Sequence, residues 1–159
     1  MPKIITFGEV MMRLSPPVHA RFVQAHSLDL TYGGGEANVA LSLAQMGLEA
    51  AHVTCFPDHA IGHAAATFLQ KYKLDTSTIL FRGKRLGTYY LETGASFRAS
   101  KVIYDRDNSA FAQLDPSSFD WDAILRGADW FHFTGITPAL SEATAQACLD
   151  AVHTANRLG

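Results

Sequence analysis

The sequence predicts an α/β protein in which a small accessory β-sheet covers one edge of a parallel core sheet. Strand and helix patterns alternate along most of the 159 residues, which is typical of a parallel sheet with crossover helices. A run of three glycines leads straight into a helix pattern. Two β-rich segments, at about 10–32 and 86–110, interrupt the alternation, and we expect them to form the accessory sheet.

The first strand is predicted at Lys3–Phe7, a short apolar and β-branched run that Gly8 closes. Its composition suits a central, buried strand. The segment before Gly8 carries one lysine and only a short apolar stretch. It therefore matches neither a signal peptide nor a membrane span.

A helix is predicted directly after the glycines. Its apolar residues Ala37, Ala40, Leu41 and Ala44 recur at helical spacing, and Gly47 suits the position just past its end. The run "EAAHVTCF" then predicts a second strand, followed by a second helix pattern. "LGTYYLETG" and "KVIYDRDNSA" predict two paired strands within the second β-rich segment.

The last strand is predicted in "ADWFHFTGI" and the last helix after Ser141, a suitable N-cap residue. We expect Ala145, Cys148, Leu149 and Val152 to face inward. A crossover helix packs on a sheet when a parallel strand follows it. The sequence stops where that strand would begin, so the architecture is expected to be incomplete.

The composition excludes some classes of partner. The net charge is −2 with both signs interspersed, which does not suggest a nucleic-acid or anionic-membrane surface. Cys55 and Cys148 lack metal-site spacing and do not form a disulfide framework, so we expect a cytoplasmic protein. His59 and His63 have the spacing of a shared metal but no third ligand, and an exposed or capping role is favoured. No metal site is predicted.

The glycine run is the first candidate site. Gly33, Gly34 and Gly35 allow backbone N–H groups to approach a ligand, and the helix start directs free N–H groups to the same place. A tight loop required only for packing explains the run equally well. Asn38 stands where a Rossmann loop needs its third glycine, and no Walker A sequence occurs.

The second candidate site lies on the β-rich segments. Strand alternation places Tyr104 and Arg106 on one face, where an aromatic ring and a guanidinium could hold a ring and a carboxylate. A half-buried sheet with packed tyrosines and a solvated arginine is the alternative, and the residues alone favour it. Gly135, Ile136 and Thr137 follow the last core strand and are candidates for a site floor or simple loop residues.

Four motifs in order resemble the PfkB, or ribokinase-like, family of carbohydrate kinases. They are "GGGEANVALSLAQMG", "RLGTYYLETG", "KVIYDRDNSA" and "FHFTGITPALS". The chain looks most like the 2-keto-3-deoxygluconate kinases within that family. The resemblance implies a ribokinase-like, Rossmann-like three-layer core with a β-sheet lid formed by the two β-rich segments. It also implies that residues 1–159 are the N-terminal part of one such domain, truncated before its C-terminal half.

The resemblance also implies the site and its ligand. Gly34 and Gly35 would contact sugar hydroxyls, and Asn38 occupies the position of the family's asparagine. Tyr89, Tyr104 and Arg106 would come from the lid, with Arg106 near the acid group of a keto-deoxy sugar acid. Ile136 would line the floor. The alternative, in which the tyrosines only pack and the arginine is solvated, is then no longer favoured for Tyr104 and Arg106.

The family reaction transfers the γ-phosphoryl group of ATP to a sugar hydroxyl with Mg²⁺. The aspartate base of the family lies in a GxGD motif, which this sequence lacks. We therefore expect this chain to hold the substrate and lid residues, to contain no catalytic base and no identifiable nucleotide site, and to be inactive alone.

Two alternatives stay open at this point. One is a fructokinase or nucleoside-kinase type of the same family, and the other is a non-catalytic α/β sugar-binding module. The lid sheet would expose an apolar face, which favours a homodimer through the lid.

Overall fold

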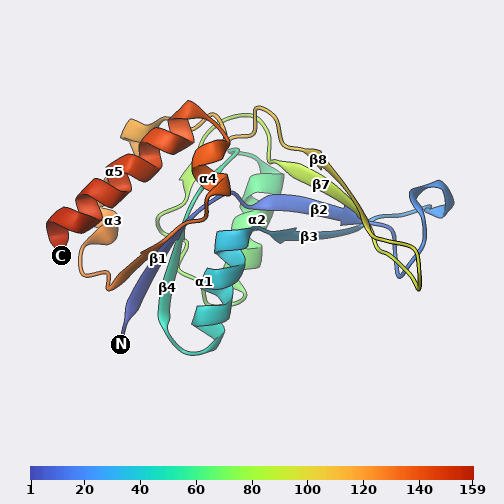
Figure 1. Ribbon diagram of the computed structural model, residues 1–159, viewed down its shortest axis with the longest axis horizontal. Helices are drawn as coiled ribbons and strands as arrows, with labels where there is room; N and C mark the ends of the chain where they lie inside the picture. Colours follow the sequence, from blue (N-terminus) through green and yellow to red (C-terminus); the bar gives the residue numbers. More distant parts are fainter.

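The computed structural model describes residues 1–159. Figure 1 shows a core of strands and helices from which a second sheet projects as an arm, with both chain ends on the side of the core away from that arm. The core and the arm correspond to the parallel sheet and the accessory sheet that the sequence predicts. We call the arm the lid.

The core sheet has three parallel strands in the order β4-β1-β9. Their bounds are β1 Lys3–Phe7, β4 Glu49–Val53 and β9 Trp130–His132. The register pairs Ile5 with Ala51 on one side and with Phe131 on the other, so β1 is central, as its apolar sequence predicts. A second, two-stranded parallel sheet joins β5 (Cys55–Phe56) to β6 (Leu80–Phe81).

Helices cover both faces of the core sheet, which gives three layers. The α-helices are α1 Gly35–Gln45, α2 Ala60–Gln70, α3 Trp121–Leu125, α4 Ile136–Ala139 and α5 Glu142–Leu158, and a short helix η2 spans Pro116–Ser118. Alanines of α1 and α2 pack with Ala50 in one buried cluster. Phe7 and Val53 point to the other cluster, which contains Trp121 of α3 and Ala147 of α5. Strand alternation therefore divides the core between two helical layers.

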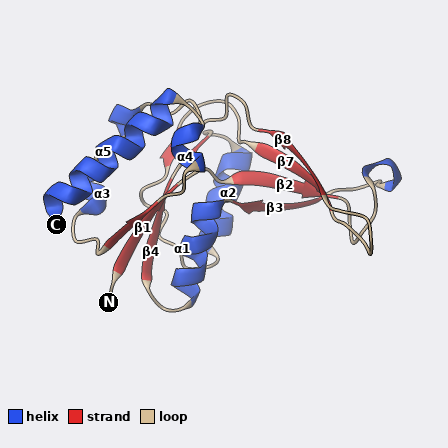
Figure 2. Cartoon of the chain, viewed as in Figure 1, coloured by secondary structure: helices blue, strands red, loops and turns tan.

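The lid is a four-stranded sheet in the order β3-β2-β7-β8. Its strands are β2 Met11–Ser15, β3 Asp29–Gly33, β7 Thr88–Glu92 and β8 Lys101–Asp105. Both β-rich segments contribute, and β7 and β8 form the antiparallel pair that the sequence predicts. Figure 2 shows that loops and the short helix η1 (Phe22–Gln24) make up the far end of the lid.

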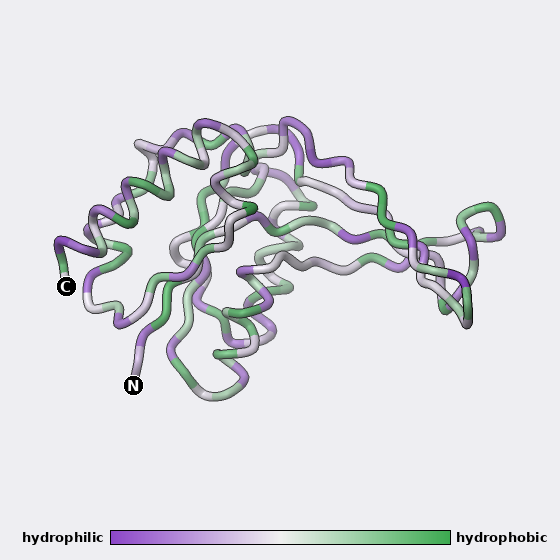
Figure 3. Tube along the Cα trace, in the orientation of Figure 1, coloured by the Kyte–Doolittle hydropathy of each residue, from purple (hydrophilic) through white to green (hydrophobic).

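Helix α5 begins where the sequence predicts, because Ser141 accepts a hydrogen bond from the N–H of Thr144 at 3.1 Å. Its turns carry both hydrophilic and hydrophobic residues (Figure 3). The predicted inward face is wrong in part: Leu149 is 54% exposed, whereas Ala147 and Ala151 are fully buried. Close packing on the sheet favours the stripe of small side chains and turns the larger leucine outward.

None of the helices combines the length and the apolar character that crossing a bilayer requires.

Candidate functional site

The glycine turn joins lid strand β3 to helix α1 at the edge where the core strands end. Gly34 is the N-cap residue of α1 in an extended conformation, with no side chain to cap the helix. A Cβ at Gly34 would overlap the backbone carbonyl oxygen of Glu9, whereas a Cβ at Gly35 would meet nothing within 4 Å. Gly34 is therefore required by close packing, and Gly35 leaves open space in front of the free N–H groups of the helix.

One face of the lid carries the predicted aromatic residues. The strand register places Thr31, Arg13, Tyr89 and Tyr104 in one row across the four strands. The rings of Tyr89 and Tyr104 lie 5.9 Å apart, and the Arg106 guanidinium lies 5.8 Å from the Tyr104 ring. We call this side the tyrosine face. Its aromatic surface and cations suit a polar ligand with an anionic group.

Arg106 reaches from the lid to the core. Its Nε donates a hydrogen bond to Oε2 of Glu9 at 2.8 Å, and its Nη2 donates to the same oxygen. Ser109 donates to the other oxygen of Glu9 at 2.5 Å. Because Glu9 also packs against Gly34, this ion pair brings Arg106 to the glycine turn.

A second buried carboxylate ties the glycine turn to the floor. Glu36, in the first turn of α1, accepts hydrogen bonds from the N–H and hydroxyl of Thr134, at 3.1 and 2.7 Å, and from the hydroxyl of Thr137 at 2.7 Å. Burial would raise the pKa of Glu36, but these hydrogen bonds together hold it below its ordinary value. Ile136 lies between the two threonines and is about half exposed, so Glu36 holds it beside the helix start.

Asn38 lies apart from these contacts. Its side chain is exposed on the first turns of α1, next to Gly33. It lines a hollow with Tyr32 and Phe68, whose rings are 5.6 Å apart. Tyr32 belongs to the face of the lid opposite Tyr89, so Asn38 borders the base of that face rather than the tyrosine face.

The buried groups beneath the site are held in their neutral forms. His52 is fully buried, and its Nδ1 lies 2.7 Å from the hydroxyl of Thr6. Burial lowers the pKa of His52 to about 4, against the opposing charge of Glu36. Burial, assisted by the charge of Glu36, raises the pKa of Cys148 to about 12. Neither group is therefore a base or a nucleophile at neutral pH.

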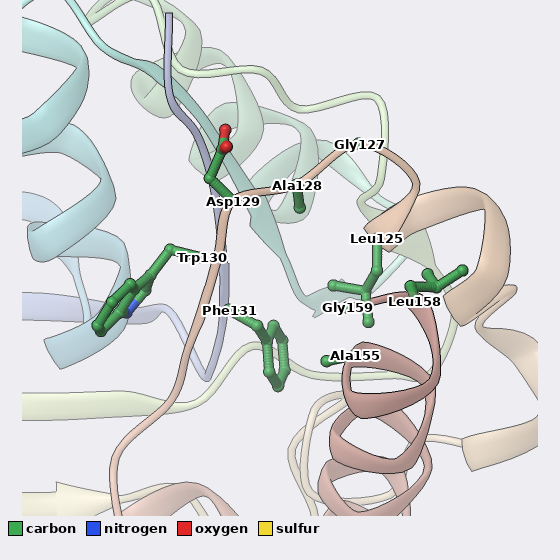
Figure 4. Close-up of a pocket in the computed structure, with 9 residues that line it drawn as sticks. All are labelled: Leu125, Gly127, Ala128, Asp129, Trp130, Phe131, Ala155, Leu158 and Gly159. Carbon is green, nitrogen blue, oxygen red and sulfur yellow. The ribbon is translucent and has the colours of Figure 1, made fainter.

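A separate pocket of about 300 Å³ lies at the other end of the core sheet. Figure 4 shows Phe131 and Ala155 on its inner side, with Trp130 directed away across β9. Asp129 precedes β9 and Trp130 begins it, so the pocket opens at the amino ends of the strands. Ligands of parallel sheets bind at the carboxyl ends, where the glycine turn lies.

Sequence reasoning missed Arg13, and for Glu9 and Glu36 it missed the buried partners that tie them to the candidate site. Glu9 and Glu36 are 4% and 1% exposed, although carboxylates are rarely buried without partners. Their partners follow by about 100 positions, so no local pattern reveals them. Arg13 lies beside Tyr89 in the register, and its Nε is buried without a hydrogen-bond partner. Strand alternation in "MMRLS" was the available signal for Arg13.

Three features together define a protein family: the glycine turn, the lid with its tyrosines and arginine, and the three-layer core. The model of the pfkB family carbohydrate kinases matches residues 1–158. The chain belongs to this family, as the four motifs predict.

Three proteins that are similar to this chain are informative. A 2-dehydro-3-deoxygalactonokinase of Haloferax volcanii is 36% identical over 157 residues, which cover 99% of this chain and 49% of that protein. The crystal structure of 2-dehydro-3-deoxygluconokinase from Thermotoga maritima is 52% identical and superposes with a TM-score of 0.97, covering 99% of this chain and 48% of the other. An E. coli protein provisionally designated ribokinase II, solved in complex with ATP and Mg²⁺, has a TM-score of 0.85 at 19% identity over 99% of this chain and 50% of that one.

The chain therefore has the ribokinase-like fold, and it spans about half the length of the relatives it matches. The family prediction and the fold prediction are both confirmed.

Proposed function

We propose that the protein containing this chain phosphorylates a keto-deoxy sugar acid, such as 2-keto-3-deoxygluconate, with ATP as the donor. Residues 1–159 form the N-terminal part of one ribokinase-like domain and supply the surface that holds the sugar. The observation that carries this proposal is the line of contacts from Gly34 through Glu9 to Arg106 and Tyr104. It places an arginine beside an open helix start and an aromatic face.

In this proposal the ligand lies between the glycine turn and the tyrosine face. The N–H groups at Gly34 and Gly35 bind sugar hydroxyls, and Tyr89 and Tyr104 cover the sugar. Arg106 binds the carboxylate, and Ile136 lines the floor. Asn38 binds a hydroxyl only if the ligand extends past the base of β3. Positioning the acceptor hydroxyl and excluding water are the contributions of this chain to in-line phosphoryl transfer.

ATP and Mg²⁺ are expected to bind elsewhere in the protein. The relative solved with ATP and Mg²⁺ shares this fold. No three His, Cys, Asp or Glu side chains of this chain lie close enough to hold a metal ion together, and no Walker A sequence occurs. The GxGD motif that carries the family's aspartate base does not occur in residues 1–159, and in this proposal another part of the protein holds the base, the nucleotide and the metal ion.

The experiment is a binding titration of the full-length protein with 2-keto-3-deoxygluconate, fructose and adenosine. We expect the acid to bind most tightly, and Arg106→Ala to weaken it by about tenfold to a hundredfold, the loss for one charge-assisted pair. A preference for fructose or adenosine that survives Arg106→Ala would contradict the proposal. In a coupled kinase assay, residues 1–159 alone are expected to give no turnover, and robust turnover would refute the assigned division of roles.

We further propose that the protein is a cytoplasmic homodimer joined through its lids. The face opposite the tyrosine face carries the apolar row Leu30, Leu14, Tyr90 and Ile103, of which Leu30 and Ile103 are 52% and 53% exposed. A second lid would cover this row. Sedimentation of Ile103→Lys should then show monomers. The two cysteines are free, as expected in a reducing compartment.

A further inference from the structure

Glu9 shares one oxygen between two donors of Arg106. Nε and Nη2 both point at Oε2 of Glu9, and Oε1 accepts from Ser109. The Glu9 side chain is 3% exposed and the Arg106 side chain 19%. The carboxylate is therefore enclosed, whereas part of the guanidinium still reaches the surface.

The pairing leaves a defined set of donors free. A guanidinium has five N–H groups in one plane. Glu9 occupies the edge formed by Nε and Nη2, so both N–H groups of Nη1 and one of Nη2 have no acceptor within the chain. The free N–H groups of Nη1 and Nη2 that point the same way form the second edge of the fork, and that edge matches a carboxylate with two parallel hydrogen bonds.

The backbone around Glu9 is shaped to fit it. A Cβ at Gly87 would lie 2.5 Å from Oε1 of Glu9, and a Cβ at Gly34 would overlap the carbonyl oxygen of Glu9. Gly87 is the residue before β7, and its carbonyl accepts a hydrogen bond from the N–H of Met12 in β2 at 2.9 Å. Glu9 is thus fixed where the lid base meets the glycine turn, and it is not free to follow Arg106 outward.

We propose that Glu9 is a positioning residue for the recognition of acids. By holding one edge of Arg106, it turns the other edge toward the ligand, so that the site prefers a carboxylate to an uncharged group. This inference rests on the proposed function, in which Arg106 binds the acid group of the sugar. The competing interpretation is that Glu9 and Arg106 only fasten the lid to the core.

The test compares an anionic ligand with its uncharged methyl ester, which differ in the charge of the acid group and in one methyl group. Binding of 2-keto-3-deoxygluconate and of its methyl ester to the full-length protein is measured by calorimetry, for the wild type and for Glu9→Gln. We expect Glu9→Gln to weaken binding of the acid by about tenfold and binding of the ester by less than about twofold, because only the acid uses the oriented edge of Arg106. In an Arg106→Ala background, Glu9→Gln should cause no further loss for the acid.

A matched control is available in the same sheet. Glu92 pairs with Arg98 at 2.6 Å in the lid, away from the tyrosine face, and its side chain is also mostly buried. Glu92→Gln should leave the ratio of acid to ester affinity unchanged. An equal loss for both ligands in Glu9→Gln, or a further loss in the Arg106→Ala background, would overturn the inference in favour of a fastening role.

The two proposals fail in different ways. If Arg106→Ala does not weaken binding of the acid, the proposed function fails, whatever the effect of Glu9→Gln. If Arg106→Ala weakens binding of the acid but Glu9→Gln does not, only the proposed positioning role of Glu9 is refuted. If circular dichroism shows that Glu9→Gln is unfolded, the same titrations are made with Ser109→Ala. An affinity for the acid that falls by about threefold, with the affinity for the ester unchanged, supports the positioning role. An unchanged affinity for the acid overturns it.

Discussion

The two buried glutamates beside the glycine turn are satisfied by different chemistry. Glu36 accepts hydrogen bonds from Thr134 and Thr137, which are neutral donors of the core. Glu9 accepts from the charged side chain of Arg106, which belongs to the lid segment. The core side of the site is therefore joined by neutral hydrogen bonds and the lid side by an ion pair.

The difference separates a structural carboxylate from one that borders the proposed ligand surface. The hydroxyl groups of Thr134 and Thr137 each have one proton, and both protons are used on Glu36. The guanidinium of Arg106 keeps donors free after binding Glu9. Of these two side-chain networks, only the lid side therefore keeps charged donors free, whereas the core side fixes the floor.

The largest expected effect is that of Glu36→Ala. The change leaves buried donors of Thr134 and Thr137 without an acceptor and opens a cavity, so we expect a loss of about 3–5 kcal/mol in the free energy of unfolding. Urea denaturation followed by circular dichroism measures it. Thr134→Ser keeps the hydroxyl and serves as the control, with a far smaller loss. A loss below about 1 kcal/mol in Glu36→Ala would mean that the network does not hold the floor.

The core side should also make the fold sensitive to acid through His52. Its folded pKa of about 4 lies below the ordinary 6.5, so the unfolded chain binds the proton first as the pH falls. This contribution is complete above pH 6.5 and is lost between pH 6.5 and about 4, by about 3 kcal/mol. The unfolding free energy measured across this range should fall, and His52→Gln should flatten the slope.

The exposed His153 supplies the control for that measurement. His153→Gln should keep the wild-type slope, and an unchanged slope in His52→Gln would assign the acid sensitivity to another group.

A further comparison concerns Gly34 and Gly35, which lie between Glu9 and Glu36 in the sequence. Gly34→Ala places a methyl group against the Glu9 backbone and should cost about 2–3 kcal/mol, a typical overpacking loss. Gly35→Ala meets open space and should change stability by about 0.5 kcal/mol or less, while it weakens ligand binding in the titration above. Thermal unfolding separates the two variants. Equal destabilisation would show that the turn is constrained on both sides.

The smallest effect is expected at an exposed ion pair, which serves as a comparison for the buried pair of Glu9 and Arg106. Arg157 of α5 binds both oxygens of Asp122 at 2.8 Å, but both side chains are more than half exposed. Asp122→Asn should therefore cost about 0–1 kcal/mol. A larger loss would indicate that contact with both carboxylate oxygens, rather than burial, determines the strength of such pairs here.

Much of the fold could be predicted because its signals are local. The apolar run of β1, the capping residue Ser141 and the alternation in β7 and β8 each depend on a few neighbouring residues. The inward face of α5 was harder, since Ala147 and Leu149 both fit a helical stripe. Only the space left by the sheet decides which of them is buried.

For the candidate site, the sequence predicts only residues that stand in a motif. Gly34, Tyr104 and Arg106 stand in the motifs that resemble the family, and the structure joins them through Glu9. Burial of Glu9 and Glu36 depends on partners about 100 residues away. Sequence periodicity carries no information on such distant pairs, and the roles of these residues emerge only in three dimensions.

The central strands of the two sheets are nearly continuous along the chain. Only Gly8, Glu9 and Val10 separate β1 from β2, and the latter two are 4% and 1% exposed. Lengthening this link by even one residue would displace Glu9 and shift one sheet against the other. The far end of the lid, where Phe97 is fully exposed, carries no such constraint. A peptide tag would therefore be accommodated at that end, whereas the short link between the sheets must keep its length.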